Sequence, residues 1–154
     1  MLNNGFDLVA SASAEMVREG FVVGYPDGCD AQVAAIREEQ KKAPDVGERD
    51  LRGLMWSSID NDTSRDLDQV EVAERVEGGI RVRVGIADVA GSVLKDTPLD
   101  KFAREQTQTV YTAVRNFSML PTELSTDLTS LNEGQDRAAH VVEFVVDEIG
   151  RAHV

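Results

Sequence analysis

The sequence has few of the features that mark a secreted or membrane protein. It contains one cysteine, Cys29, so no intrachain disulfide can form, and a lone thiol fits a reducing compartment. No apolar run approaches the roughly 20 residues of a membrane span, and the N-terminus has no basic segment followed by a long apolar one. We therefore expect a soluble, cytoplasmic protein with no membrane partner and no secretory signal. A monomer is the default expectation.

Positive charge is also scarce. The chain has 16 lysines and arginines against 28 aspartates and glutamates, which gives a formal net charge of -12. Nucleic-acid-binding proteins normally carry a basic footprint, so the total charge argues against that class. An acidic total is nevertheless compatible with a local basic channel. The 154 residues, 42% of them hydrophobic, correspond to about one globular domain.

Aspartate, in contrast, is concentrated in one place. Asp60, Asp62, Asp66 and Asp68 fall within nine residues. Carboxylates this close repel one another, and a chain that holds them together usually has a cation to place between them. Asp66 and Asp68 point the same way in an extended chain, and Asp60 approaches across the turn of residues 61–65. Hard carboxylate oxygens suit Mg²⁺ or Mn²⁺, and paired ions of this kind assist phosphodiester cleavage.

Two other interpretations of the cluster stay open from the residues alone. The ligand positions of an EF-hand calcium loop are matched by Asp60, Asp62, Ser64, Asp66, Asp68 and Glu71. The sixth position, where glycine is needed for a left-handed turn, is Arg65, and the flanking segments predict strands instead of helices. The second interpretation is a solvated acidic loop, because aspartate, asparagine and serine favour turns.

The patterns around the cluster predict an α+β fold with a mixed, mainly antiparallel sheet. A short strand is expected over residues 54–59, ahead of the aspartates. After them, strands over 70–76 and 80–86 form a hairpin around Glu77–Gly79. An amphipathic helix is expected from Pro98, and a closing strand over 141–147. The aspartates are thus expected on the loop that leads into a rigid hairpin.

The two ends of the chain differ in character from this central part. Residues 1–48 predict a helical lead-in, with one helix capped by Ser11 or Ser13 and a second that starts at Asp30 and stops at Pro44. Residues 148–154 match one reading frame of a common sequencing-library adapter. We therefore expect a non-native tail after a native sequence that ends near Asp147, in a truncated gene fragment.

Six blocks of residues, in order and with fitting gaps over about residues 49–147, resemble the RNB catalytic domain of the ribonuclease II and ribonuclease R family. The blocks are Ser58–Gln69, Ile86–Val89, Pro98–Asp100, Val110–Tyr111, Met119–Ser125, and Ser130–Asn132 with Asp136–Arg137. Members of this family degrade single-stranded RNA processively from the 3′ end with Mg²⁺ and release nucleoside 5′-monophosphates. The resemblance implies the N-terminal part of that domain, incomplete and preceded by a short helical segment.

The resemblance also implies roles for individual residues. Asp60, Asp66 and Asp68 match three of the family's four active-site aspartates, which carry catalysis and hold the metal. The fourth position is Gln69, whose amide oxygen can contact a metal but brings no charge and cannot act as a base. Tyr111 matches the aromatic residue that packs against the terminal nucleotides. Candidate phosphate contacts are Arg115, Arg81, Arg83 and Arg104, while Asp88 is expected to support the site by hydrogen bonding.

We therefore expect a 3′-to-5′ exoribonuclease that hydrolyses single-stranded RNA with Mg²⁺, or with Mn²⁺ in its place. The alternative is a catalytically weakened RNA-binding relative, which Gln69 and the acidic charge favour, and a calcium-binding loop protein is the third hypothesis. The 154 residues alone are expected to show little or no nuclease activity, because the resemblance places further site residues after Asp147.

Overall fold

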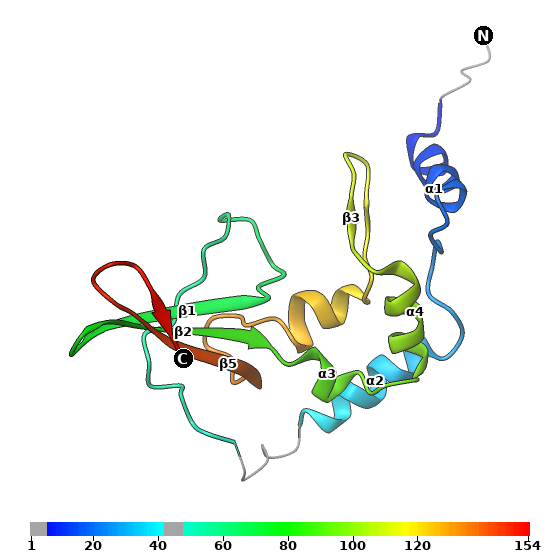
Figure 1. Ribbon diagram of the computed structural model, residues 1–154. Coiled ribbons are helices and arrows are strands. Elements are labelled where there is room, and N and C mark those ends of the chain that lie inside the picture. The colour runs from blue at the N-terminus through cyan, green and yellow to red at the C-terminus, as the bar shows by residue number, and fades with distance from the viewer. Residues whose placement is uncertain (1–5, 42–47) are drawn as a thin grey trace.

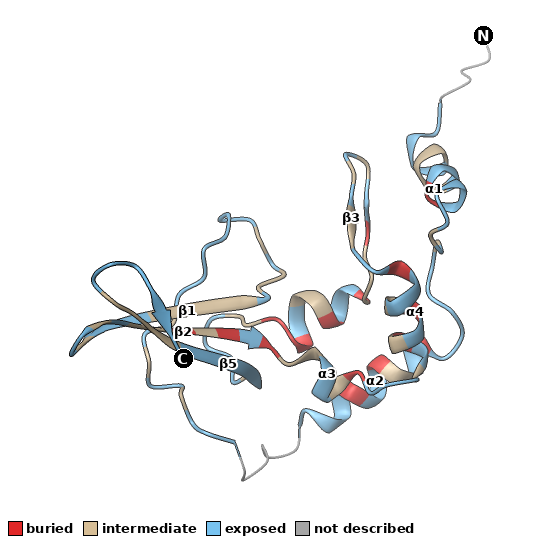
Figure 2. Cartoon of the chain, in the orientation of Figure 1, coloured by how far each residue is buried: buried red, intermediate tan, exposed pale blue. Residues whose placement is uncertain are grey.

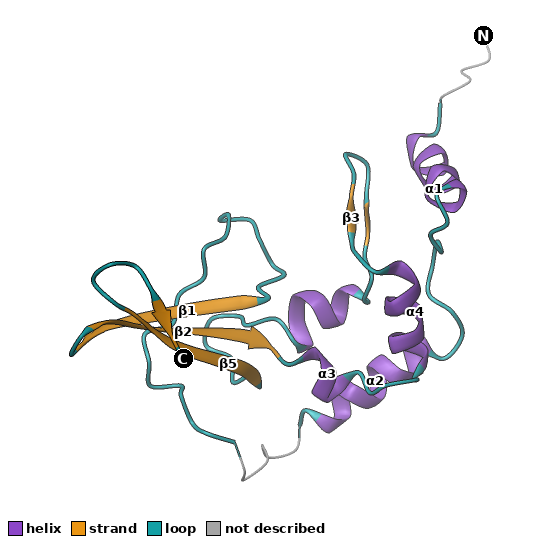
Figure 3. Cartoon of the chain, in the orientation of Figure 1, coloured by secondary structure: helices purple, strands orange, loops and turns teal. Residues whose placement is uncertain are grey.

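The computed structural model describes residues 6–41 and 48–154, and it places a sheet at one end of the molecule and the helices at the other (Figures 1 and 3). In chain order the elements are α1 (Leu8–Arg18), α2 (Cys29–Glu39), β1 (Gln69–Val76), β2 (Gly79–Ala87), α3 (Val89–Ser92), α4 (Pro98–Gln106), β3 (Val110–Tyr111), β4 (Asn116–Phe117), the π-helical turn η1 (Leu124–Leu128), β5 (Ala139–Val146) and β6 (Ala152–His153). The α+β prediction is confirmed. No helix in the described ranges is both long and apolar enough to cross a membrane.

The main sheet has the strand order β1-β2-β5-β6, with antiparallel pairing throughout. The predicted hairpin is present, and its turn depends on Gly79. This residue has a φ of 158°, and a Cβ atom there would lie 2.1 Å from the carbonyl oxygen of Val146. Only glycine therefore lets β2 start this close to β5.

Arg83 corrects an expectation from the sequence. Alternation along β2 suggested a solvent-facing arginine that could contact phosphate, but only 9% of its side chain is exposed. Its Nε atom donates to Glu143 Oε2 at 2.5 Å, and its guanidinium also contacts Glu74 Oε1 at 3.0 Å. Cross-strand pairing places these carboxylates on either side of it, so Arg83 joins β1, β2 and β5 and is not available to RNA.

The strand expected over residues 54–59 is wrong. A single bridge joins Ser57 to Glu71, with N–O distances of 3.0 and 2.8 Å, and the rest of the segment is loop. Trp56 is half-buried, and its indole N–H donates to the Leu51 carbonyl at 2.9 Å. The ring lies against Gly85 of β2, which has no side chain to displace it. The loop is therefore held beside the sheet by one bridge and one aromatic ring.

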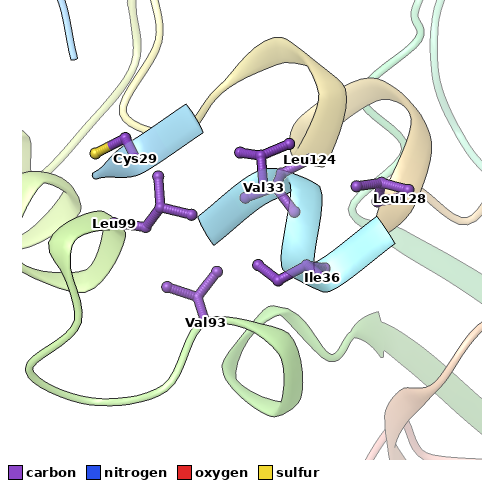
Figure 4. Close-up of a cluster of buried hydrophobic side chains, with 7 residues drawn as sticks. All are labelled: Cys29, Val33, Ile36, Val93, Leu99, Leu124 and Leu128. Carbon is purple, nitrogen blue, oxygen red and sulfur yellow. The ribbon is translucent and has the colours of Figure 1, made fainter. Parts of the chain in front are cut away.

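A cluster of buried hydrophobic side chains lies among the helices (Figures 2 and 4). It consists of Cys29, Val33, Ile36, Val93, Leu99, Leu124 and Leu128. Gln32 of α2 adds two hydrogen bonds to the start of α4, donating to Thr97 Oγ1 at 2.9 Å and accepting from the Leu99 amide at 3.0 Å. Although α2 precedes the predicted boundary at residue 48, it shares one core with α4 and η1.

The helix starts and the C-terminal end add details that the sequence patterns did not give. Asp7 caps α1 by accepting from the Ala10 amide, in place of the predicted serines, and α2 begins after Gly28, one residue before Asp30. Pro44, the predicted helix stop, lies outside the described residues. At the other end, β6 pairs with β5 through the register Val145↔His153. The adapter origin of residues 148–154 stays a prediction.

Candidate active site

The aspartate segment runs from the Ser57 bridge to the start of β1, as the sequence predicted. Asp68 continues the β1–β2 ladder, because its carbonyl accepts from the Ala87 amide at 2.9 Å. Asp66 and Asp68 line one pocket of about 760 Å³, together with Tyr111 and residues of η1. Asp60 is exposed and does not line this pocket. The structure thus joins two of the three predicted catalytic aspartates directly and keeps the third beside them.

The electrostatics of the pocket show that Asp66 and Asp60 act on the carboxyl group of Asp68. Partial burial raises the pKa of Asp68, and the negative charges of Asp66 and Asp60 raise it further. A cation placed between them would relieve this repulsion. The chemistry of the donors therefore suits Mg²⁺ or Mn²⁺, which prefer carboxylate oxygens.

The carboxylates do not converge into a finished metal site. Within residues 6–41 and 48–154, no three histidine, cysteine, aspartate or glutamate side chains form a group able to hold a metal ion. Gln69 is half-buried at the start of β1 and is not part of the pocket wall. Adjacent residues of an extended chain point to opposite faces, which turns Gln69 away from the face of Asp68. The metal-ligand set of Asp60, Asp66, Asp68 and Gln69 remains a prediction.

Tyr111 reaches the aspartates from β3, on a hairpin that projects from the body of the molecule (Figure 1). Its hydroxyl donates to Asp66 Oδ2 at 2.7 Å. This hydrogen bond is the main cause of a raised pKa of the tyrosine, followed by burial and by the charges of Asp66 and Asp68. The side chain is nevertheless 64% exposed, so its ring has an open face. The structure therefore combines a hydroxyl bound to a carboxylate with an aromatic surface open to solvent.

Arg115 precedes β4 on the same hairpin. Its guanidinium carbon lies 4.5 Å from the centre of the Phe117 ring, a cation–π arrangement. It is not part of the aspartate pocket. Arg104 forms ion pairs with Asp100 and Asp96, and Arg81 pairs with Glu74 and Glu143. Among the described residues, Arg81, Arg83 and Arg104 each have a carboxylate partner, whereas none contacts Arg115. Arg115 is also the candidate phosphate contact that lies nearest to Tyr111 along the chain.

Asp88 confirms the expectation that it acts through hydrogen bonds. Its Oδ1 atom accepts from the Gly91 amide at 2.9 Å and caps α3. The same oxygen lies 3.1 Å from Nε2 of His140, on β5. Asp88 does not line the aspartate pocket, whereas its neighbours Ala87 and Val89 do. It therefore supports one wall of the pocket from outside.

The EF-hand interpretation is wrong. The aspartate segment is followed by strand β1, and it is preceded by loop and a single bridge, so neither flanking helix is present. In the part of the chain that the structure describes, the non-glycine residues with positive φ are Asp96 and Thr107. Arg65 is thus not in the left-handed turn that a calcium loop requires at its sixth position.

Sequence reasoning missed two residues of this region. Arg65 lines the aspartate pocket, where the sequence analysis considered it only as an unsuitable calcium-loop residue. Ser130 is 1% exposed, and its hydroxyl contacts the backbone on both sides of Asp66. Its presence in a block shared with a known family was the one available signal, since a serine 64 positions away from Asp66 carries no local pattern.

Comparison with known proteins identifies the family. The model of the RNB domain matches residues 48–153. The chain belongs to the RNB-domain family. Ribonuclease R of Escherichia coli is 39% identical over 128 residues, which are 82% of this chain and 16% of that protein. Ribonuclease R of Mycoplasma pneumoniae is 32% identical over 152 residues, 98% of this chain and 21% of that protein.

Solved structures of RNB relatives have the same fold. Mycoplasma genitalium RNase R in complex with ribose-methylated single-stranded RNA matches with a TM-score of 0.82 and 29% identity over 95% of this chain. The same protein in complex with double-stranded RNA matches with a TM-score of 0.79 and 27% identity. The aligned region covers 23% and 26% of those chains. This RNB chain thus spans about a quarter or less of the length of these relatives.

Proposed function

We propose that this RNB chain provides the aspartate-bearing part of a 3′-to-5′ exoribonuclease, which hydrolyses single-stranded RNA with Mg²⁺ and releases nucleoside 5′-monophosphates. The observation that carries the proposal is the pocket that Asp66 and Asp68 share with Tyr111, in a family whose relatives are ribonucleases. The free, buried thiol of Cys29 agrees with a cytoplasmic location.

Each residue of the pocket has a separate task in this proposal. Asp66 and Asp68 would hold the metal, and Asp60 adds negative charge that strengthens its attraction to the site. When bound, Mg²⁺ supplies an activated water and neutralises charge on the phosphate. The exposed ring of Tyr111 stacks against the terminal base. This stacking accepts any base, because every base has a π-face. Arg115, in the turn between β3 and β4, would contact the RNA backbone.

The test is a product assay on the full gene product that contains this chain. An RNA with a single-stranded 3′ overhang should be shortened from its 3′ end, with 5′-monophosphates as the product and with loss of activity when EDTA removes Mg²⁺. Internal cleavage, or no monophosphate release under any divalent ion, would reject the proposal. The 154-residue chain assayed in parallel should release little, because it spans 16% to 21% of the matched ribonucleases.

A catalytically weakened RNA-binding protein is the second candidate. Gln69 in place of an aspartate and the absence of a converged metal group among the described residues both favour it. The same assay separates the two, because such a protein would retard the RNA in a binding experiment and leave its length unchanged.

Changing Gln69 to aspartate should tighten Mg²⁺ binding by roughly 3- to 10-fold, because a negative charge one residue from Asp68 attracts the cation even from the opposite face of the strand. Isothermal titration of the full gene product with Mg²⁺ measures this directly. The exposed Gln135, changed to aspartate, makes the same charge change far from the aspartates in the chain and outside their pocket, and should leave the titration unaltered. Equal or weaker binding by Gln69→Asp would contradict a role for this position near the metal.

A further inference from the structure

Ser130 occupies an unusual place for a polar side chain. It is 1% exposed and belongs with Leu99, Leu124 and Cys29 to the most completely buried side chains of the described chain. It follows the C-terminal end of η1, on the segment that leads back towards β5. A buried hydroxyl is costly unless it is hydrogen-bonded, so its partners show what it does.

Both sides of Asp66 are bound by this one hydroxyl. Ser130 Oγ accepts a hydrogen bond from the Leu67 amide at 3.0 Å and donates to the Arg65 carbonyl at 2.9 Å. A longer contact of 3.3 Å joins the same oxygen to Asn132 Oδ1. The next residue continues the connection, because the Leu131 amide donates to the Leu67 carbonyl at 2.9 Å.

The two peptide groups that Ser130 holds are those that flank the α-carbon of Asp66. Fixing both peptide groups limits the backbone rotation at Asp66 that would swing its carboxylate out of the pocket. The carboxylate itself is held from the other side by the Tyr111 hydroxyl at 2.7 Å. A site residue is useful only if its surroundings keep it within a fraction of an ångström of the productive position.

We propose that Ser130 is a positioning residue for RNA hydrolysis, which acts by fixing the backbone on both sides of Asp66. The inference rests on the proposed function, since it assumes that Asp66 takes part in the reaction. It goes beyond the aspartates and Tyr111 because Ser130 does not line their pocket and touches the reaction only through Asp66.

The experiment compares Ser130→Ala with a matched hydroxyl elsewhere. Thr97 Oγ1 also makes two hydrogen bonds, accepting from Gln32 at 2.9 Å and donating to the Leu94 carbonyl at 2.6 Å, and it lies outside the aspartate pocket. Thr97→Val therefore removes a similar amount of hydrogen bonding without touching Asp66. In the full gene product, kcat for monophosphate release should fall about 10- to 100-fold in Ser130→Ala, the range known for supporting residues around metal ligands.

The KM for RNA should change less than about 2-fold in Ser130→Ala, because the RNA contacts stay in place. Ser130→Thr keeps the hydroxyl and should recover most of the rate. Mn²⁺ binding without RNA, measured by electron paramagnetic resonance, should weaken about 10-fold in Ser130→Ala and stay unchanged in Thr97→Val. If Ser130→Ala and Thr97→Val behave alike in rate and Mn²⁺ binding, the positioning role is refuted.

Hydrogen exchange of the Leu67 amide in the unaltered 154-residue chain gives a measurement that needs no variant. The amide should be protected, because its acceptor is a buried oxygen. Exchange at the rate of an unprotected amide would overturn the inference even if Ser130→Ala failed to fold.

Asp66→Asn separates this inference from the proposed function. If Asp66→Asn keeps the full rate, Asp66 has no part in the reaction, and the positioning role of Ser130 is refuted as well. If Asp66→Asn is inactive while Ser130→Ala matches Thr97→Val, the proposed function stands and only the positioning role is lost.

Discussion

Replacing Asp68 by asparagine should lower monophosphate release by the full gene product at least about 100-fold, more than the loss expected for a residue that only supports a metal ligand. Asp68 lies in the pocket with Asp66, and desolvation, together with the neighbouring charges, raises its pKa. An amide has nearly the same shape but carries no negative charge, so the site would lose attraction for Mg²⁺ without losing its packing. The rate of 5′-monophosphate release at saturating RNA and Mg²⁺ measures the effect.

Asp62 provides the matched control for this substitution. It belongs to the same segment and is exposed, and it does not line the pocket. Asp62→Asn makes the same change of charge a few residues away and should reduce the rate less than about 2-fold, as surface substitutions usually do. Similar losses of rate in both variants would mean that the total charge of the loop controls the reaction and that Asp68 has no specific catalytic role. An unchanged rate in Asp68→Asn would remove it from the catalytic set.

Replacing Leu124 by alanine should lower the free energy of unfolding of the 154-residue chain by about 2–5 kcal/mol. Leu124 is fully buried at the start of η1, in the cluster that joins α2, α4 and η1 (Figure 4). The loss combines the transfer free energy of the deleted methyl groups with the cost of the cavity that remains. Urea denaturation followed by circular dichroism gives the free energy directly.

The control for this prediction is Leu94→Ala. Leu94 is 62% exposed, so truncation removes little buried surface and should change the stability by no more than about 0.5 kcal/mol. Equal effects of the two substitutions would show that the helical cluster does not form as described. Because η1 leads directly to Ser130, a loosened core should also increase hydrogen exchange at the Leu67 amide.

Short-range features of the fold could be predicted because they depend on neighbours in the chain. The alternation of apolar and polar residues located the β1–β2 hairpin, and the glycines after Glu77 located its turn. The same reasoning failed at residues 54–59. These residues form a loop that is held beside the sheet by one bridge and by the Trp56 ring over Gly85, and neither contact leaves a periodic pattern.

Long-range pairings decided the roles of single residues. Alternation places Arg83 on a polar face, but the carboxylate that buries it lies on β5, 60 residues further along the chain. Residues 1–48 were predicted only as a helical lead-in, yet Gln32 binds the start of α4 across 65 and 67 residues. Periodicity shows on which side of a strand or helix a residue lies, but it does not show which distant segment packs against that side.

The sequence by itself determined most of the chemical content of the site: closely spaced aspartates and a tyrosine in the order of an RNB domain. The tertiary structure decided how they meet. It places the Tyr111 hydroxyl on Asp66, 45 residues away, and ties the backbone beside Asp66 to Ser130, 63 residues from Leu67. The physical reason is that a side chain's chemistry is a property of the residue, whereas its position depends on which segments pack together when the chain folds.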